Sequence, residues 1–157
     1  MKIVLNTSPV IFLSKIGCLH LLADCANELY IPQGVIDELH EYRLPPFIQP
    51  CTLSEVGAAY VRGALGRLHQ GELEAIILSQ ELDTDFVVLD DLLARRKAEG
   101  LGLKVIGTIG ILLLLEKRGL LNANQTWQKI TQLTERHNMY LSPQLLKRLK
   151  VQLLGIY

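Results

Sequence analysis

The fold is decided by one stretch of the chain, which reads Gly71-Glu72-Leu73-Glu74-Ala75-Ile76-Ile77-Leu78 and then Asp85-Phe86-Val87-Val88-Leu89-Asp90-Asp91. The first half is an almost wholly apolar helix pattern with two glutamates in its first turn. The second half is a short β-branched strand that ends in two aspartates. Parallel α/β sheets bind their ligands beyond the carboxyl ends of the strands. The stretch therefore predicts a buried helix and strand with carboxylates at a functional edge.

The rest of the chain repeats this alternation of strand and helix. Strands are also predicted at residues 2–5, 28–31 and 103–106, and helices at residues 9–16, 19–26, 33–41, 54–68, 92–99 and 108–115. Residues 43–51 hold three prolines within six residues and are predicted to be a connector. The alternation favours an α/β fold with a central parallel sheet flanked by helices on both faces.

Beyond Gly119 the pattern changes to two amphipathic helices, at residues 125–136 and 142–154. The second helix has an apolar stripe that consists of Leu145, Leu146, Leu149, Leu153 and Leu154. This stripe could pack on the sheet or on a second subunit, and the second alternative favours a homodimer. We expect one domain over residues 1–157, with a helical C-terminal extension from about residue 120.

Composition and charge exclude several classes of protein. The chain has 157 residues, 49% of them hydrophobic and 20% charged, which is typical of a globular α/β protein rather than a disordered one. Its 16 basic and 16 acidic side chains cancel, so nucleic-acid binding requires a local basic patch. The three cysteines form no Cys-x-x-Cys pair, and neither a signal peptide nor a membrane span is predicted. We therefore expect a cytoplasmic protein without a membrane partner.

Asn6 and Glu72 are expected at the same edge of the sheet as Asp90 and Asp91. Asn6 directly follows the first strand, which lies at the central switch point of a doubly wound sheet. Glu72 stands in the first turn of a helix whose other positions are nearly all apolar, so this turn must emerge from the core. Glu72 either belongs to the site or only complements the helix dipole.

One acidic residue is also expected from the helix after the second strand. Asp37 and Glu38 are neighbours there, and their side chains point about 100° apart, so only one of them can face inward. We favour Glu38, because Ile36 and Leu39 frame the buried face of this helix. The edge of the sheet would then collect oxygen atoms from four separate segments.

Oxygen side chains that converge in this way suit a hard cation such as Mg²⁺ or Mn²⁺. The four histidines have no zinc spacing, which disfavours a zinc site. A divalent ion would lower the pKa of a bound water and neutralise charge on a phosphodiester. Thr7 and Ser8 then supply water-orienting hydroxyls, or Ser8 instead caps the first helix in front of Pro9.

At these residues the chain resembles the PIN-domain nucleases, and in particular the short prokaryotic PIN-like proteins related to VapC-type toxins. The resemblance is carried by Ile3-Val4-Leu5-Asn6-Thr7-Ser8-Pro9, Ile31-Pro32-Gln33-Gly34-Val35-Ile36-Asp37-Glu38-Leu39, Gly71-Glu72-Leu73-Glu74-Ala75-Ile76 and Val88-Leu89-Asp90-Asp91-Leu92-Leu93-Ala94-Arg95-Arg96. It implies a Rossmann-like PIN fold and a divalent-metal site of clustered acids. It also implies endoribonuclease activity that a small antitoxin partner often holds in check.

The resemblance assigns site residues by position. Catalytic acids would be Glu38, Glu72 and Asp90, with Asp91 as an alternate or additional member, and Asn6 would join Glu38, Glu72 and Asp90 as a metal ligand. One position departs from the family, which usually has aspartate where this chain has Asn6. Because the amide brings no charge, metal affinity and water activation should both fall. The protein is then either a weakened ribonuclease or a catalytically inactive PIN-like module that binds RNA or a protein.

Basic residues lie close to the acids in the sequence. Arg95, Arg96 and Lys97 follow Asp91, and Arg62 and Arg67 precede Glu72. These side chains either hold an RNA backbone, which positions the strand without reading its sequence, or form a solvated helix face. Trp127 and most of the five tyrosines are predicted to be packing residues, because they lie away from the acidic stretches.

Overall fold

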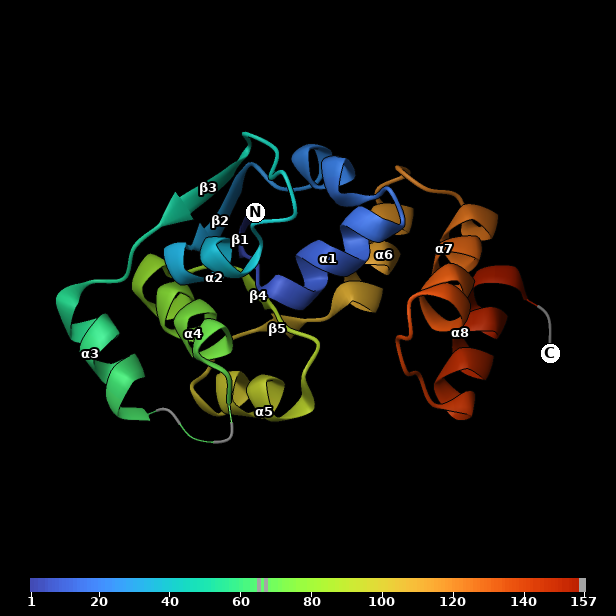
Figure 1. Ribbon diagram of the computed structural model, residues 1–157. Coiled ribbons are helices and arrows are strands. Elements are labelled where there is room, and N and C mark those ends of the chain that lie inside the picture. Colours follow the sequence, from blue (N-terminus) through green and yellow to red (C-terminus); the bar gives the residue numbers. More distant parts are fainter. Residues whose placement is uncertain (65, 67, 156–157) are drawn as a thin grey trace.

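The computed structural model describes residues 1–64, 66 and 68–155 (Figure 1). Five parallel strands form one sheet in the order β3-β2-β1-β4-β5. Their bounds are β1 (Lys2–Val4), β2 (Glu28–Pro32), β3 (Ile48–Cys51), β4 (Phe86–Val88) and β5 (Val105–Ile106). In the centre of the sheet, Val4 of β1 pairs with Tyr30 of β2 on one side and with Val87 of β4 on the other. The predicted parallel sheet is confirmed.

Helices follow or connect these strands. They are α1 (Thr7–Lys15), the short 3₁₀ helix η1 (Leu19–Asp24), α2 (Gln33–Glu38), α3 (Glu55–Ala64), α4 (Gln70–Leu82), α5 (Leu92–Gly100), α6 (Thr108–Lys117), α7 (Ala123–Arg136) and α8 (Pro143–Leu154). None of the described helices is both long enough and apolar enough to cross a membrane.

Both faces of the sheet are covered by helices, as the sequence predicts. Successive residues of a strand point to opposite faces, so Ile3 and Leu5 belong to one core cluster and Val4 to the other. The first cluster packs under α1 and α6, and the second under α4 and α5 (Figure 1). Strands buried on both faces read as continuous apolar runs, which explains the sequence of β1 and β4.

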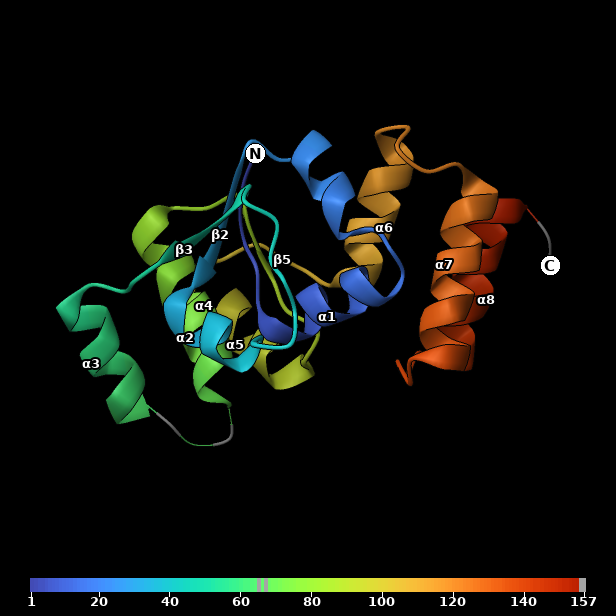
Figure 2. The ribbon, with the colours of Figure 1, turned by 45° about the horizontal axis from the view of Figure 1, so that its top comes forward.

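The last two helices form an antiparallel pair beside α1 and α6 (Figures 1 and 2). Ser142 begins α8, because its hydroxyl accepts a hydrogen bond of 3.1 Å from the backbone N–H of Leu145. Leu149 and Leu153 of α8 are buried in the cluster that also holds Ile130 of α7. Two leucines of the apolar stripe are therefore buried within the chain, whereas Leu145, Leu146 and Leu154 are only partly buried, and the homodimer stays a prediction.

Three local predictions are wrong. Residues 43–51 include strand β3 rather than only a connector. In the described sheet β3 pairs with β2 alone, and an edge position tolerates Pro50, which has no N–H to donate.

Two predicted helix boundaries also differ from the structure. The first helix begins at Thr7, so Ser8 lies inside its first turn and is not the cap. The helix predicted at residues 33–41 ends at Glu38. Arg67, predicted as a basic contact, lies outside the described residues.

Candidate functional site

The order of the strands places a switch point between β1 and β4. The chain moves from β1 outward to β2 and β3, and then returns to the other side of β1 as β4. Asn6 follows β1 and Asp90 follows β4, so both lie at the carboxyl edge beside this point. Asn6 is only 5% exposed there. Sheets of this kind bind ligands in the crevice outside such a switch point.

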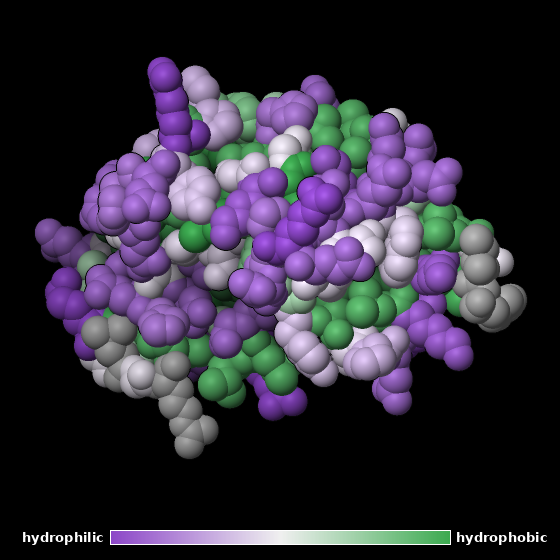
Figure 3. Space-filling view, turned by 45° about the vertical axis from the view of Figure 1, so that its right-hand side comes forward, coloured by the Kyte–Doolittle hydropathy of each residue, from purple (hydrophilic) through white to green (hydrophobic). Residues whose placement is uncertain are grey.

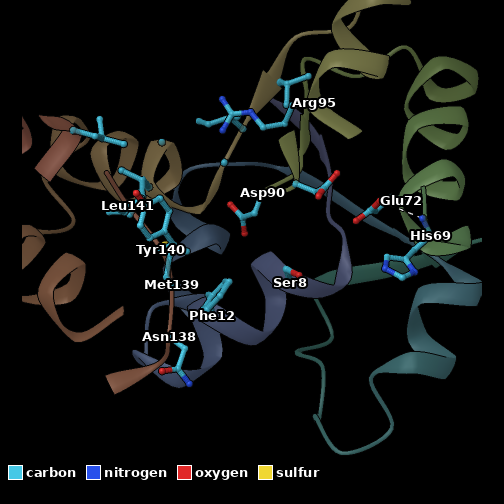
Figure 4. A pocket seen from close by; sticks show the side chains of 17 residues that line it. Ser8, Phe12, His69, Glu72, Asp90, Arg95, Asn138, Met139, Tyr140 and Leu141 are labelled. Atoms are coloured by element: carbon cyan, nitrogen blue, oxygen red, sulfur yellow. Dashed lines mark hydrogen bonds between the residues drawn. The ribbon is translucent and has the colours of Figure 1, made fainter. Parts of the chain in front are cut away.

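A hollow of about 690 Å³ opens at this edge (Figure 4). We call it the acidic hollow, because its polar wall consists of Ser8, His69, Glu72, Asp90, Asp91 and Arg95. The opposite wall includes Phe12 and residues 138–141, which belong to the segment between α7 and α8. The sheet edge and the C-terminal helix pair therefore enclose the hollow together.

A second hollow of about 430 Å³ adjoins the first, and we call it the side hollow. It is lined by Asn6, Thr7, Ser8, Glu38, His69, Gln70, Gly71 and Glu72. Ser8, His69 and Glu72 line both hollows. The acids and the amide expected from the sequence therefore lie along two connected hollows rather than in one, and Glu72 stands at their junction.

Hydrogen bonds fix the two aspartates after β4. Asp90 accepts two bonds from Thr108, at the start of α6: one of 2.7 Å from the backbone N–H and one of 2.7 Å from the hydroxyl. Asp91 caps α5 by accepting a bond of 2.9 Å from the N–H of Ala94. Asp90 is thus held by a distant segment, whereas Asp91 has a local structural role in addition to lining the acidic hollow.

Glu38 is held at the side hollow by α1 and α4. The hydroxyl of Thr7 donates a hydrogen bond of 2.7 Å to Glu38 Oε2. The other carboxylate oxygen lies against Gly71, where an added Cβ would stand 2.9 Å from Glu38 Oε1. Gly71 therefore leaves room for this carboxylate at the start of α4. Its neighbour Asp37 is exposed on the same short helix and lines neither hollow.

Burial and negative charge act together on Glu72. Partial burial raises the pKa of Glu72, and the charges of Asp91 and, more weakly, Glu38 raise this pKa further. A hydrogen bond of 3.3 Å from the backbone N–H of His69 to Glu72 Oε2 opposes the rise. The junction of the hollows is therefore a place where negative charge accumulates and where a cation would be stabilised.

A model of the PIN-domain family matches residues 2–154, which is nearly the whole chain and includes every one of these residues. The chain belongs to the PIN-domain family. No curated protein and no solved structure is significantly similar to it. The membership confirms the resemblance at the level of the family and agrees with the five-stranded parallel sheet. PIN domains are nuclease-type modules that act on RNA and generally use divalent metal ions.

The oxygen donors of this PIN domain fit such an ion in their chemistry. Carboxylate, amide and hydroxyl oxygens are the hard ligands that Mg²⁺ and Mn²⁺ take. Among the described residues, no group of three or more His, Cys, Asp or Glu side chains is arranged to hold a metal ion. Mg²⁺ usually needs only one or two direct carboxylates, because water and substrate phosphates complete its shell. The donors therefore suit a site that substrate and water complete.

The predicted basic residues of the PIN domain differ in their distance from the acidic hollow. Arg95 lines the acidic hollow, and an added Cβ at Gly107 would lie 3.0 Å from its Nη1 and 3.1 Å from Asp90 Oδ1. Arg96 and Lys97 are exposed on α5, and Arg62 is exposed on α3. Among the four members of this group that the structure describes, Arg95 is the one that lines the acidic hollow.

Three residues of the site were not identified from the sequence. His69 caps the start of α4 and lines both hollows, although no site role was predicted for any histidine. Thr108 was expected only as the first residue of a helix, yet it donates two hydrogen bonds to Asp90. Tyr140 was expected among packing residues, yet it is 83% exposed and lines the acidic hollow. The sequence contained a signal for His69, because a glutamate three residues after the residue that precedes a helix is typical of a capping box. No local pattern marks Thr108 or Tyr140.

Proposed function

We propose that this protein is a divalent-metal-dependent endoribonuclease of the PIN type, which hydrolyses phosphodiester bonds of RNA at the acidic hollow. The observation that carries the proposal is the position of Glu72 at the junction of the two hollows. Asn6 and Glu38 line the side hollow next to Glu72, and Asp90 and Asp91 line the acidic hollow. Oxygen atoms from four separate segments thus surround one edge of the sheet.

Each side chain has a role in this proposal. A Mg²⁺ or Mn²⁺ ion would be held by side chains from both hollows, namely Asn6, Glu38, Glu72 and Asp90, with Asp91 as an additional ligand. When bound, the ion supplies an activated water and neutralises charge on the phosphodiester. Thr7 keeps Glu38 in place through its hydrogen bond. The exposed hydroxyl of Ser8 faces both hollows, where it can orient the attacking water.

The RNA backbone would be held by the cations of α5. Arg95 lies in the wall of the acidic hollow, and Arg96 and Lys97 are exposed on the same helix. Contacts of this kind bind phosphates and position the strand without selecting a base sequence. Because the protein carries no net charge, we expect such binding to depend on this local group of cations and to weaken with added salt.

The test is cleavage of single-stranded and structured RNA by the purified protein in Mn²⁺, in Mg²⁺ and in EDTA. The native protein should cut RNA only with a divalent ion, and Glu72→Gln should abolish cutting because it removes a charged oxygen at the junction. Glu55→Gln is the matched control, since Glu55 is an exposed glutamate in the first turn of α3. Equal cleavage by the native protein and Glu72→Gln would identify a contaminating nuclease and end the proposal.

A second function is favoured by Asn6, which is nearly buried and brings no charge to the site. On this alternative the protein is a catalytically inactive PIN-like module that binds RNA or a protein such as an antitoxin. Calorimetric titration with Mn²⁺ separates the two functions. The nuclease should bind Mn²⁺ with an enthalpy change that Glu72→Gln reduces, whereas the inactive module should bind RNA or protein without binding the ion.

A further inference from the structure

The acidic hollow has two chemically different walls (Figure 4). The wall at the sheet edge carries the acids and Arg95. The opposite wall is mostly apolar and comes from α1, α6 and the segment between α7 and α8; its side chains include Phe12, Ile109, Met139, Tyr140 and Leu141. Figure 3, in which the right-hand side of Figure 1 comes forward, shows apolar side chains (green) among hydrophilic ones (purple) on that face of the molecule. The proposed hydrolysis uses none of these apolar side chains.

Tyr140 differs from the other members of the apolar wall. Its side chain is 83% exposed, whereas Met139 and Leu141 on either side of it are partly buried and pack against the core. The segment is anchored at its start, because Asn138 adopts a left-handed conformation (φ 59°) and the N–H of Met139 donates a hydrogen bond of 3.0 Å to Leu133 O. An anchored loop segment therefore holds one aromatic ring exposed to solvent at the hollow.

A nucleotide has the same division between polar and apolar parts. Its phosphate suits a metal ion at Glu72 and Asp90 and the guanidinium of Arg95, and its flat base suits an aromatic ring. The hollow, at about 690 Å³, lies within the range of roughly 300–1,000 Å³ that is typical of small-ligand pockets. Figure 4 shows Tyr140 and Glu72 on opposite sides of the hollow, with Asp90 between them in this view. Phosphate and base can thus be accommodated together.

We propose that Tyr140 is a base-stacking subsite, on which an unpaired base of the RNA strand lies while its phosphate is held at the acidic wall. The inference rests on the proposed function for the choice of RNA as the ligand. It makes the C-terminal helix pair part of the substrate site and not only of the core. It also predicts that single-stranded RNA is preferred, because a paired base cannot leave its stack without an additional free-energy cost.

The test measures binding and cleavage separately with the full chain. With Ca²⁺ in place of Mn²⁺, fluorescence anisotropy gives the Kd for a labelled single-stranded oligoadenylate, for the same oligomer with abasic riboses, and for a fully paired duplex. Gel electrophoresis of the same samples checks that the oligomers stay intact. Variants are Tyr140→Ala, Tyr140→Phe and the control Tyr60→Ala, since Tyr60 is a tyrosine 44% exposed on α3, away from both hollows. Far-ultraviolet circular dichroism of each variant checks that it is folded.

Tyr140→Ala should raise the Kd for oligoadenylate by about 5- to 150-fold, which is the range for loss of one stacked base. Tyr140→Phe and Tyr60→Ala should bind like the native protein, and the abasic oligomer should bind native protein and Tyr140→Ala equally. With Mn²⁺, Tyr140→Ala should raise KM and change kcat less.

The outcomes distinguish this inference from the nuclease proposal. RNA binding that depends on Tyr140 without any cleavage supports the stacking subsite and refutes the nuclease. Cleavage and binding that are unchanged in Tyr140→Ala overturn the subsite and leave the nuclease intact; the exposed ring would then be a contact for a protein. Absence of RNA binding by the native protein overturns the subsite as well.

Discussion

Thr108 binds both carboxylate oxygens of Asp90, with its backbone N–H on Oδ1 and its hydroxyl on Oδ2, each at 2.7 Å. Thr108 is fully buried at the start of α6, so its hydroxyl cannot exchange this partner for water. Because α6 follows β5 and Asp90 follows β4, the pair fixes the acid with respect to two neighbouring strands. The orientation of Asp90 therefore depends on a segment that carries no acid of its own.

The first prediction concerns this pair. Thr108→Val keeps the shape of the side chain but removes the hydroxyl, which leaves Asp90 Oδ2 without its donor. We expect the free energy of unfolding to fall by about 1.5–3 kcal/mol, the range for hydrogen bonds to charged groups. Urea unfolding measures this loss. Thr108→Ser keeps the hydroxyl and should retain most of the stability; a Val variant as stable as the native protein would show that the bond contributes nothing.

The second prediction concerns Gly71, which leaves room for the carboxylate of Glu38. In Gly71→Ala the new Cβ would lie 2.9 Å from Glu38 Oε1, at the flexible end of that side chain, and 3.3 Å from Cγ2 of the buried Val35. The carboxylate should move aside and Val35 should shift slightly, at a small cost in stability. RNA cleavage should fall by up to about 100-fold, because small displacements of catalytic groups are costly. Steady-state cleavage and thermal unfolding measure the two effects.

Gly63→Ala is the matched control for this change. Gly63 lies inside α3, and an added Cβ would meet nothing within 4 Å. Alanine is favoured over glycine in a helix by up to about 1 kcal/mol, so the control should be slightly more stable and should cleave RNA like the native protein. If both alanine variants cleaved equally well, Glu38 would have no part in the reaction.

These positions also show which parts of the fold and site were predictable. Strands β1 and β4 were identified because each is a β-branched apolar run followed by a polar residue, and the switch point then placed Asn6 and Asp90 at one edge. Strand β3 was missed because proline removes a hydrogen-bond donor, and only its edge position makes this tolerable. Sequence periodicity does not report which strand lies at an edge.

The rest of the site depends on contacts between distant segments. Thr108 was predicted only to start a helix, since nothing in its local sequence indicates that Asp90 is its partner. Tyr140 lies in a turn without periodicity, and its place at the hollow follows only from the packing of α7 and α8 beside α1 and α6 (Figure 2). Residues that end a strand were therefore predictable, and residues brought in by tertiary packing were not.

The third prediction follows from the raised pKa of Glu72 in the metal-free protein. The folded state holds this proton more tightly than the unfolded state, so between the ordinary value of 4.5 and the raised pKa it carries more bound protons than the unfolded state does. Stability attributable to Glu72 is thus present at acidic pH and is lost as the pH rises through the folded-state pKa. Urea midpoints in EDTA, measured from acidic to neutral pH, should decline more steeply for the native protein than for Glu72→Gln. If the urea midpoints of the two proteins declined equally with pH, the raised pKa of Glu72 would be contradicted.

The fourth prediction concerns Asn6, which is 5% exposed beside Glu38 and Glu72 in the side hollow. Asn6→Asp adds a third carboxylate where charge is already concentrated, so the metal-free variant should lose about 3–5 kcal/mol, as expected for an uncompensated buried charge. Mn²⁺ should restore this loss, because it neutralises the added charge. Thermal unfolding should therefore show a larger Mn²⁺-induced rise in Tm for Asn6→Asp than for the native protein. The exposed control Asn124→Asp on α7 should show no such difference, and an equal rise in all three proteins would place the ion elsewhere.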